Sequence, residues 1–221
     1  MERLSWDSNF FEIEVYKTFF NNNLNNIIET VSFDLLYLIS NSKIDINSIN
    51  RPIQLVDKKV TFYKQLQDIK TDRNTEVISV NQCNNKLINL SIQSSEFSRF
   101  RIDDKINNNK VDELYTKWIE NSLKRKLSFE VLTYSDEYKG LITLGEKNNR
   151  ADIGLLAVDN KSRGLGIGKS LIKEAERTCI LKNYKELQVV TQLDNILACN
   201  FYKSQGFIID KIEYIYHIWN K

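Results

Sequence analysis

One segment, residues 155–170, constrains the fold of this chain more than any other. It begins with an apolar run typical of a buried strand, passes through Arg163 into three alternating glycines, and ends in an amphipathic pattern typical of a helix. Glycine lets a backbone approach an anion closely, and the first N–H groups of a helix point at such an anion. The segment therefore predicts a strand–loop–helix unit that binds a phosphate group.

The spacing of the glycines excludes two common phosphate loops. A nucleoside-triphosphate loop needs a glycine separated by four residues from Gly-Lys-Ser/Thr, and for Gly168-Lys169-Ser170 that position holds Arg163. The dinucleotide pattern Gly-x-Gly-x-x-Gly also fails, because a match starting at Gly164 would need glycine at Lys169, and a match starting two residues later fails at Leu171. The remaining pattern is Arg-Gly-x-Gly-x-Gly directly after a strand.

Composition and charge limit the classes of partner. The net charge is +2 and acidic residues lie between the basic ones, so we expect no nucleic-acid partner. Residues 1–7 contain acids where a secretion signal would have an apolar core, and no apolar run reaches the length of a membrane span. Cys83, Cys179 and Cys199 are odd in number and lack metal-ligand spacing. We therefore expect a cytoplasmic protein with reduced, buried thiols and no metal.

The chain changes in texture at residues 67–74, which are polar and without apolar periodicity. We interpret them as a linker between a small domain at 1–74 and a larger one at 75–221. The first part has a helical pattern at 25–40 that becomes strand-like at 35–39, and a strand pattern at 54–63. The second part predicts a strand at 75–80, helices at 84–96 and 111–126, strands at 129–134, 140–145 and 152–158, the glycine-loop helix, a strand at 187–191, a helix at 196–203, and a closing strand or strand pair at 207–219.

A second motif follows the loop. Residues 195–207 fit the pattern Asn-x-x-Ala-x-x-x-Tyr-x-x-x-Gly-Phe. With Arg163 and two of the glycines filling Gln/Arg-x-x-Gly-x-Gly/Ala, and with the same order of elements over roughly 145 residues, the chain resembles the GNAT acetyltransferase superfamily. Helix packing of Ala198 on Tyr202, and a left-handed turn at Gly206 that ends the helix, are the purely structural explanation of the second motif.

This resemblance implies a fold and a donor. The fold is α/β (α+β), the GNAT acyl-CoA N-acyltransferase fold: a mixed, mostly antiparallel sheet flanked by helices, here with a truncated N-terminal α/β domain. The donor is acetyl-CoA, which acts as a co-substrate, and no metal is required. In the superfamily a backbone N–H at the end of the fourth strand stabilises the oxyanion, and the asparagine contacts the pantetheine arm. The implied cofactor-binding residues are Leu156, Ala157, Val158, Arg163, Gly164, Leu165, Gly166, Ile167, Gly168, Lys169, Asn195 and Phe201.

The chemistry of acetyl transfer fits these residue types. An amine attacks the thioester, and a thiolate with a pKa of about 8.5 leaves; a tyrosine with a pKa near 10 is still protonated at neutral pH and can donate to it. Tyr202 is therefore the predicted general acid. Glu146, at the end of a neighbouring strand, is the candidate base. The alternative is that Glu146 is only a solvated carboxylate in a loop. The single histidine, His217, lies in an alternating run and is interpreted as a strand residue.

Three further segments carry a narrower resemblance. Residues 4–11, 98–101 and 118–121 are similar to dTDP-fucosamine acetyltransferases of bacterial surface-polysaccharide synthesis. This resemblance implies a nucleotide-linked amino-deoxysugar as acceptor, with Arg99 and Arg101 clamping its diphosphate or hydroxyls. Surface salt bridges are the alternative for both arginines. The chain departs from that pattern at residues 103–105, where Asp-Asp-Lys replaces aromatic and proline residues.

Two other functions stay open from the sequence. A GNAT enzyme could acetylate another amine, such as a polyamine, an antibiotic or a protein N-terminus. A non-catalytic module that binds acyl-CoA would keep the same motifs without chemistry. The closing apolar strand also offers an edge that could pair across a homodimer.

Overall fold

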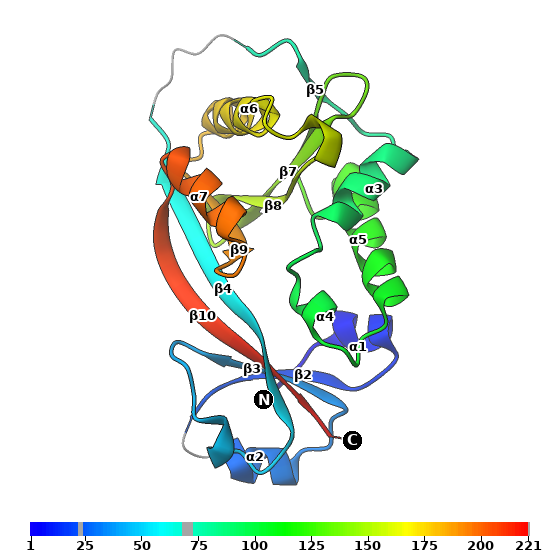
Figure 1. Ribbon diagram of the computed structural model, residues 1–221, viewed down its shortest axis with the longest axis vertical. Helices are drawn as coiled ribbons and strands as arrows, with labels where there is room; N and C mark the ends of the chain where they lie inside the picture. Colours follow the sequence, from blue (N-terminus) through cyan, green and yellow to red (C-terminus); the bar gives the residue numbers. More distant parts are fainter. Residues whose placement is uncertain (22–23, 68–72, 221) are drawn as a thin grey trace.

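The computed structural model describes residues 1–21, 24–67 and 73–220, and its strands form one sheet in the order β1-β2-β3-β10-β4-β9-β8-β7-β6-β5 (Figure 1). The strands are β1 Glu2–Arg3, β2 Val15–Phe19, β3 Leu35–Ser40, β4 Ile53–Gln65, β5 Val77–Ser79, β6 Glu130–Tyr134, β7 Gly140–Lys147, β8 Arg150–Val158, β9 Glu186–Gln192 and β10 Ile208–Trp219. The helices are α1 Ser5–Phe11, α2 Leu24–Thr30, α3 Asn85–Gln93, α4 Arg99–Ile102, α5 Asn108–Leu123, α6 Ile167–Leu181 and α7 Ile196–Ser204.

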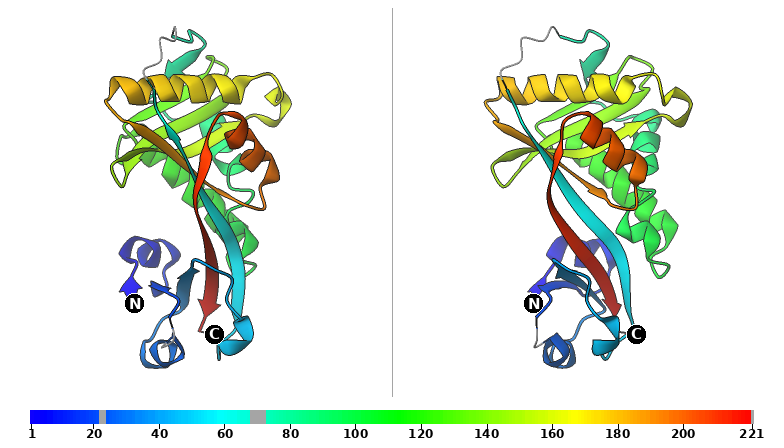
Figure 2. Two further views of the ribbon diagram at one scale, coloured as in Figure 1. Left: turned by 90° about the vertical axis from the view of Figure 1, so that its left-hand side faces the viewer. Right: turned by 60° about the vertical axis from the view of Figure 1, so that its left-hand side comes forward.

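Most strand pairs are antiparallel, as predicted, and only β2–β3 and β8–β9 run parallel in the described sheet. Successive strand residues enter different cores: Leu141 packs with α3 and α5, whereas Ile142 packs with α6. Burial on both faces explains the continuous apolar runs of β6 to β8. Figure 2 shows α6 crossing one face of the sheet while α5 lies on the other. This part of the sheet confirms the predicted fold class.

Two long strands extend the sheet into the N-terminal part of the chain. β4 pairs with β9 and along its length with β10, and β10 continues onto β3 (Figure 1). The predicted domain boundary at residue 74 lies next to residues 68–72, which are outside the described residues. The sheet itself is continuous between β4, before that boundary, and β9, after it. The division into 1–74 and 75–221 therefore stays a proposal about separate units.

Some sequence expectations need correction. The closing element is a single strand. Residues 214–219 of β10 pair with β3, whereas residues 208–213 pair only with β4, so the edge expected to pair across a homodimer stays a prediction for that stretch. Cys179 and Cys199 are buried free thiols as expected, but Cys83 is exposed, since it precedes α3 in a surface loop. The segments β1, α1, β2 and α4 were not predicted, because each is short and lacks a clear apolar period. His217 lies in β10, as predicted. No helix within the described ranges is long and apolar enough to cross a membrane.

Candidate active site

The sheet opens between β8 and β9. These strands pair only where residues 151–153 meet residues 187–189, although both continue beyond that point. The pairing of β8 with β7 is irregular at the same place, where Gly154 and Leu155 together lie opposite Thr143, and the Leu155 N–H donates to Thr143 Oγ1 at 2.9 Å. Such a bulge bends a strand and increases its twist. The result is a wedge whose backbone groups are available to an extended ligand, with Leu156, Ala157 and Val158 along its β8 side.

The glycine loop joins this wedge to α6. Gly164 and Gly166 have φ angles of +80° and +79°, and a Cβ built on either would meet no heavy atom within 4 Å. These glycines are therefore required for backbone conformation and not for space. The N–H groups of Ile167, Gly168 and Lys169 make no backbone hydrogen bond to the described residues, while the next N–H, of Ser170, bonds to the Gly166 carbonyl. Three free N–H groups at the start of a 15-residue helix fit a pyrophosphate.

The side chains of the loop divide into two groups. Arg163, Leu165 and Lys169 are exposed beside the loop, whereas Ile167 is buried in the core and offers a ligand only its backbone. The Arg163 Nε donates to the Val158 carbonyl at 3.3 Å, which ties the loop to the end of β8. Gly168 has a packing role, because a Cβ there would lie 3.2 Å from the ring of Phe201 on α7. Phe201 therefore holds α7 against the loop.

We expect Gly166→Ala to weaken acetyl-CoA binding about tenfold, which corresponds to about 1.4 kcal/mol. The added methyl has open space, but a left-handed φ costs a non-glycine residue roughly 1–2 kcal/mol, and the loop relieves this strain by moving its N–H groups. Titration calorimetry with acetyl-CoA measures the change. Gly206→Ala is the matched control, since Gly206 has a φ of +85° after α7 and an added Cβ would lie nearest to the flexible side chain of Lys64, at 3.5 Å. Gly206→Ala should lower Tm about as much as Gly166→Ala and leave the acetyl-CoA Kd unchanged. Equal Kd values for the two variants would contradict the assignment of the loop to acetyl-CoA binding.

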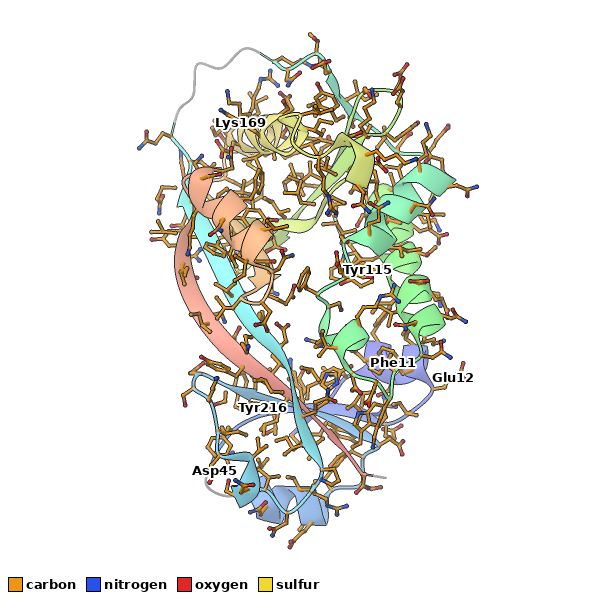
Figure 3. The ribbon with its side chains drawn as sticks, in the orientation of Figure 1. Phe11, Glu12, Asp45, Tyr115, Lys169 and Tyr216 are labelled. Carbon is orange, nitrogen blue, oxygen red and sulfur yellow. The ribbon has the colours of Figure 1, made fainter. Side chains whose placement is uncertain are left out.

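A cavity of about 650 Å³ lies at the mouth of the wedge, a size typical of small-molecule sites. Its lining includes Leu156 of β8, Tyr202 and Ala198 of α7, Tyr115 of α5 and Arg99 of α4. Figure 3 shows Tyr115 reaching from α5 toward the middle of the molecule. Residues of α4, α5 and α7 therefore line one cavity.

Tyr202 enters the cavity from a closely packed aromatic environment. Its ring contacts Phe62, Phe201 and Phe207 with centroid distances of 6.0, 5.5 and 5.8 Å, and the residue is 5% exposed. Burial raises the pKa of its hydroxyl above the usual value, with the neighbouring Cys199 adding to the effect. No group in the described parts of the chain hydrogen-bonds that hydroxyl. Its proton is therefore retained at neutral pH and can be donated toward the cavity.

The other predicted site residues have different positions. Asn195 lines the cavity, but its Oδ1 accepts the Ala198 N–H at 3.1 Å and so caps α7, which leaves the amide nitrogen for a ligand. Glu146 is exposed and lines the cavity, and its carboxylate accepts a hydrogen bond from the hydroxyl of Tyr184. Arg99 lines the cavity as well, with its guanidinium carbon 4.6 Å from the ring centroid of Tyr37. The structure therefore brings Tyr202, Asn195, Glu146 and Arg99 together.

Arg101 lies elsewhere. It forms an ion pair with Asp112 and hydrogen bonds with Asn108 at 3.1 Å and with Ser95 Oγ at 3.0 Å. These partners fasten α4 to α3 and α5. Arg101 lines a smaller cavity beside Arg163 and not the cavity that contains Tyr202. Its side chain thus has the structural role that was the alternative explanation from the sequence.

One acidic residue of the cavity was missed from the sequence. Asp57 of β4 is 6% exposed and lines the cavity, and its Oδ1 has no hydrogen-bond partner among the described residues. Burial raises the pKa of this carboxyl to about 6, against the opposing influence of Arg99, Gln192 and Lys59. An aspartate in a strand-like run is usually expected on the solvent face, so no local signal identified it.

Comparison with known proteins places the chain in a family. Residues 93–207, slightly more than half of the chain, match the family described as Acetyltransferase (GNAT) family. The chain belongs to this family. The match confirms the predicted fold class, and the family is one of acetyltransferases.

Three individual relatives share 30% identity or less with this chain over the residues that match. The uncharacterized protein YxbD of Bacillus subtilis (strain 168) is 30% identical over 84 residues, which cover 38% of this chain and 52% of YxbD. The spore coat polysaccharide biosynthesis protein SpsD of the same organism is 23% identical over 123 residues, which cover 55% of this chain and 43% of SpsD. The chain thus spans about half the length of these curated relatives. A functionally unknown conserved protein from Staphylococcus epidermidis ATCC 12228 shares the fold, with a TM-score of 0.60 at 16% identity over 94% of this chain and 84% of that one.

Proposed function

We propose that this GNAT chain transfers the acetyl group of acetyl-CoA to the amino group of a nucleotide-linked amino-deoxysugar, such as a dTDP-4-amino-4,6-dideoxyhexose. The observation that carries the proposal is the cavity at the mouth of the wedge, which combines the cationic side chains of Arg99 and Lys59 with the aromatic side chains of Trp6 and Trp118. Arg99 Nε is buried without a hydrogen-bond partner among the described residues, which suits a phosphate or sugar oxygen. The similarity to SpsD, a protein named for polysaccharide biosynthesis, supports the same class of acceptor.

The geometry supplies the parts of a direct transfer. The free N–H groups at the start of α6 hold the pyrophosphate, and the separated edge of β8 receives the extended pantetheine arm. A backbone N–H near Ala157 or Val158 stabilises the oxyanion that forms when the amine attacks. Tyr202 donates a proton to the departing thiolate. The unpaired thiols of Cys179 and Cys199 support a cytoplasmic location for this reaction.

The acceptor is tested by measuring release of free CoA thiol from acetyl-CoA with a panel of amines. We expect dTDP-4-amino-4,6-dideoxygalactose to give a kcat/KM at least about 10²-fold above spermidine, streptothricin and a peptide with a free N-terminus, because a site with buried polar groups discriminates strongly against acceptors that leave them unpaired. A smaller amine that outperforms the sugar nucleotide would assign the chain to another acceptor class. Acetyl-CoA binding without thiol release for any amine would indicate a non-catalytic module.

A further inference from the structure

Asp57 is placed in the cavity by an irregularity in the sheet. The pairing of β4 with β10 shifts between Asp57, opposite Ile215, and Leu55, opposite Tyr216, so that Val56 is an extra residue. A bulge of this kind re-aims the side chains next to it. Asp57 and Lys59 both line the cavity as a result.

The surroundings of Asp57 do not satisfy its carboxylate. The charged and titratable groups that act on it are Lys59 on the same strand, Arg99 from α4, Tyr115 from α5 and Asp194 after β9. Despite two nearby cations, Oδ1 lacks a hydrogen-bond partner among the described residues, while the residue is more than nine-tenths buried. A buried carboxylate without a complete set of partners destabilises a fold, and such groups are typical of sites that work on a ligand.

The location of Asp57 complements that of Tyr202. Lys59 of β4 pairs with Gln192, at the end of β9, so this stretch of β4 borders the open side of the wedge. Tyr202 enters the same cavity from α7. Two protic groups on different elements therefore border the mouth of the wedge, and their pKa values are moved apart in the pattern of an acid and a base: Tyr202 stays protonated, and Asp57 titrates close to neutral pH.

We propose that Asp57 is the proton acceptor for the substrate amine, acting directly or through one water. This inference rests on the acetyl transfer proposed above. The amine arrives as an ammonium ion, and Asp57 removes one proton to expose the nitrogen lone pair. The N–C bond forms and the C–S bond breaks; Tyr202 protonates the leaving thiolate and is restored by the second proton that the nitrogen loses. The products are the amide and CoA thiol, and the proton on Asp57 passes to solvent.

The test is Asp57→Asn assayed with dTDP-4-amino-4,6-dideoxygalactose. At pH 7 we expect kcat/KM to fall about 10²-fold, with the acetyl-CoA Kd unchanged. The wild-type profile of kcat/KM against pH should lose activity below about pH 6, and the variant should lack this limb. With O-methylhydroxylamine, which is already neutral at pH 7 and needs no base before attack, the loss should shrink to less than about fivefold.

A readout independent of activity comes from stability. Because the pKa of Asp57 is raised in the folded state, the folded chain binds the proton more readily, and the ionised carboxylate destabilises the fold above about pH 6. Asp57→Asn should therefore raise Tm at pH 8 by about 5 °C, with the difference vanishing toward pH 4. Glu174→Gln is the control, since Glu174 is a buried carboxylate on α6 that is paired with Arg177 and lies outside the cavity. It should leave both kcat/KM and its pH profile unchanged.

The outcomes separate the two proposals. If the wild type turns over and Asp57→Asn has the same kcat/KM, the role of Asp57 is overturned while the proposed acetyl transfer stands. An equal loss at every pH and with both acceptors would also overturn it, because that pattern indicates a structural role. Absence of thiol release by the wild type with every amine would instead overturn the acetyl transfer itself.

Discussion

Replacing Tyr202 by phenylalanine is expected to lower kcat by about 10²–10⁴-fold while the acetyl-CoA Kd stays the same. The substitution removes only the hydroxyl, and the ring keeps its contacts with Phe62, Phe201 and Phe207. Since no described residue bonds that hydroxyl, the fold should lose little stability. Without the donor, the thiolate must leave unprotonated or wait for water. Release of CoA thiol under saturating substrates measures kcat, and calorimetry measures the Kd.

Tyr216→Phe is the matched control for this experiment. Tyr216 is as buried as Tyr202, but its hydroxyl accepts the N–H of Ile44, and the residue lies in the lower half of the molecule in Figure 3. Its loss should lower stability by about 1 kcal/mol and leave kcat within about twofold. Unchanged turnover in Tyr202→Phe would remove Tyr202 from the mechanism, and a loss accompanied by weaker acetyl-CoA binding would assign it to binding.

The parts of the site that follow from local backbone geometry could be predicted from the sequence. The glycine pattern predicted a strand, a loop and a helix in succession, and α6 begins directly after Gly166. Asn195 and Gly206 begin and end α7 because capping preferences act within a single turn. Each of these features depends on residues only a few positions apart in the chain.

The two arginines of α4 show where a local pattern is insufficient. Arg99 and Arg101 were assigned the same role, yet residues two apart on a helix point about 200° away from each other. Arg99 therefore faces the cavity, and Arg101 faces Asp112 on α5. The sequence did not reveal α4, because four residues are too few to show a helical period.

Asp57 could not be predicted for a different reason. Its place depends on the insertion of β4 between β9 and β10, and on one extra residue in the pairing with β10. Strand order and register are set by contacts between segments that are far apart in the chain, and a shift by one residue turns a side chain to the other face. The wedge that exposes β8 has the same non-local origin.

Asp103 is the residue whose loss should most affect the stability of this site. Its carboxylate Oδ2 lies 2.6 Å from His217 Nδ1 and accepts the indole N–H of Trp219 at 2.9 Å, and the residue is 1% exposed. Asp103 follows α4, so these bonds fasten the helix that carries Arg99 to β10. Asp103 is thus an internal tether between α4 and β10.

We expect Asp103→Ala to lower the free energy of unfolding by roughly 2–4 kcal/mol, because the buried His217 and the half-buried Trp219 lose their hydrogen-bond partner at about 1–3 kcal/mol each. For a chain of this size, Tm should fall by roughly 5–15 °C. Asp104→Ala is the control, since Asp104 is adjacent but exposed and its removal should change stability by less than about 0.5 kcal/mol. Equal Tm values for the two variants would contradict the tether.

The pH dependence of stability gives the same prediction a second check. Burial favours a higher pKa for Asp103, but its hydrogen bonds with His217 and Trp219 outweigh this effect and the pKa is lowered. The contribution of Asp103 is therefore complete above the unfolded-state pKa of about 3.9 and is lost as the pH falls further. Burial also lowers the pKa of His217, so the unfolded chain binds a proton below about pH 6.5 that the folded chain does not, and stability falls on acidification. Urea unfolding between pH 3 and pH 7 measures the free energy of unfolding of both proteins. The difference between wild type and Asp103→Ala should narrow below about pH 4, because there the wild-type Asp103 is protonated and its carboxylate is lost as well.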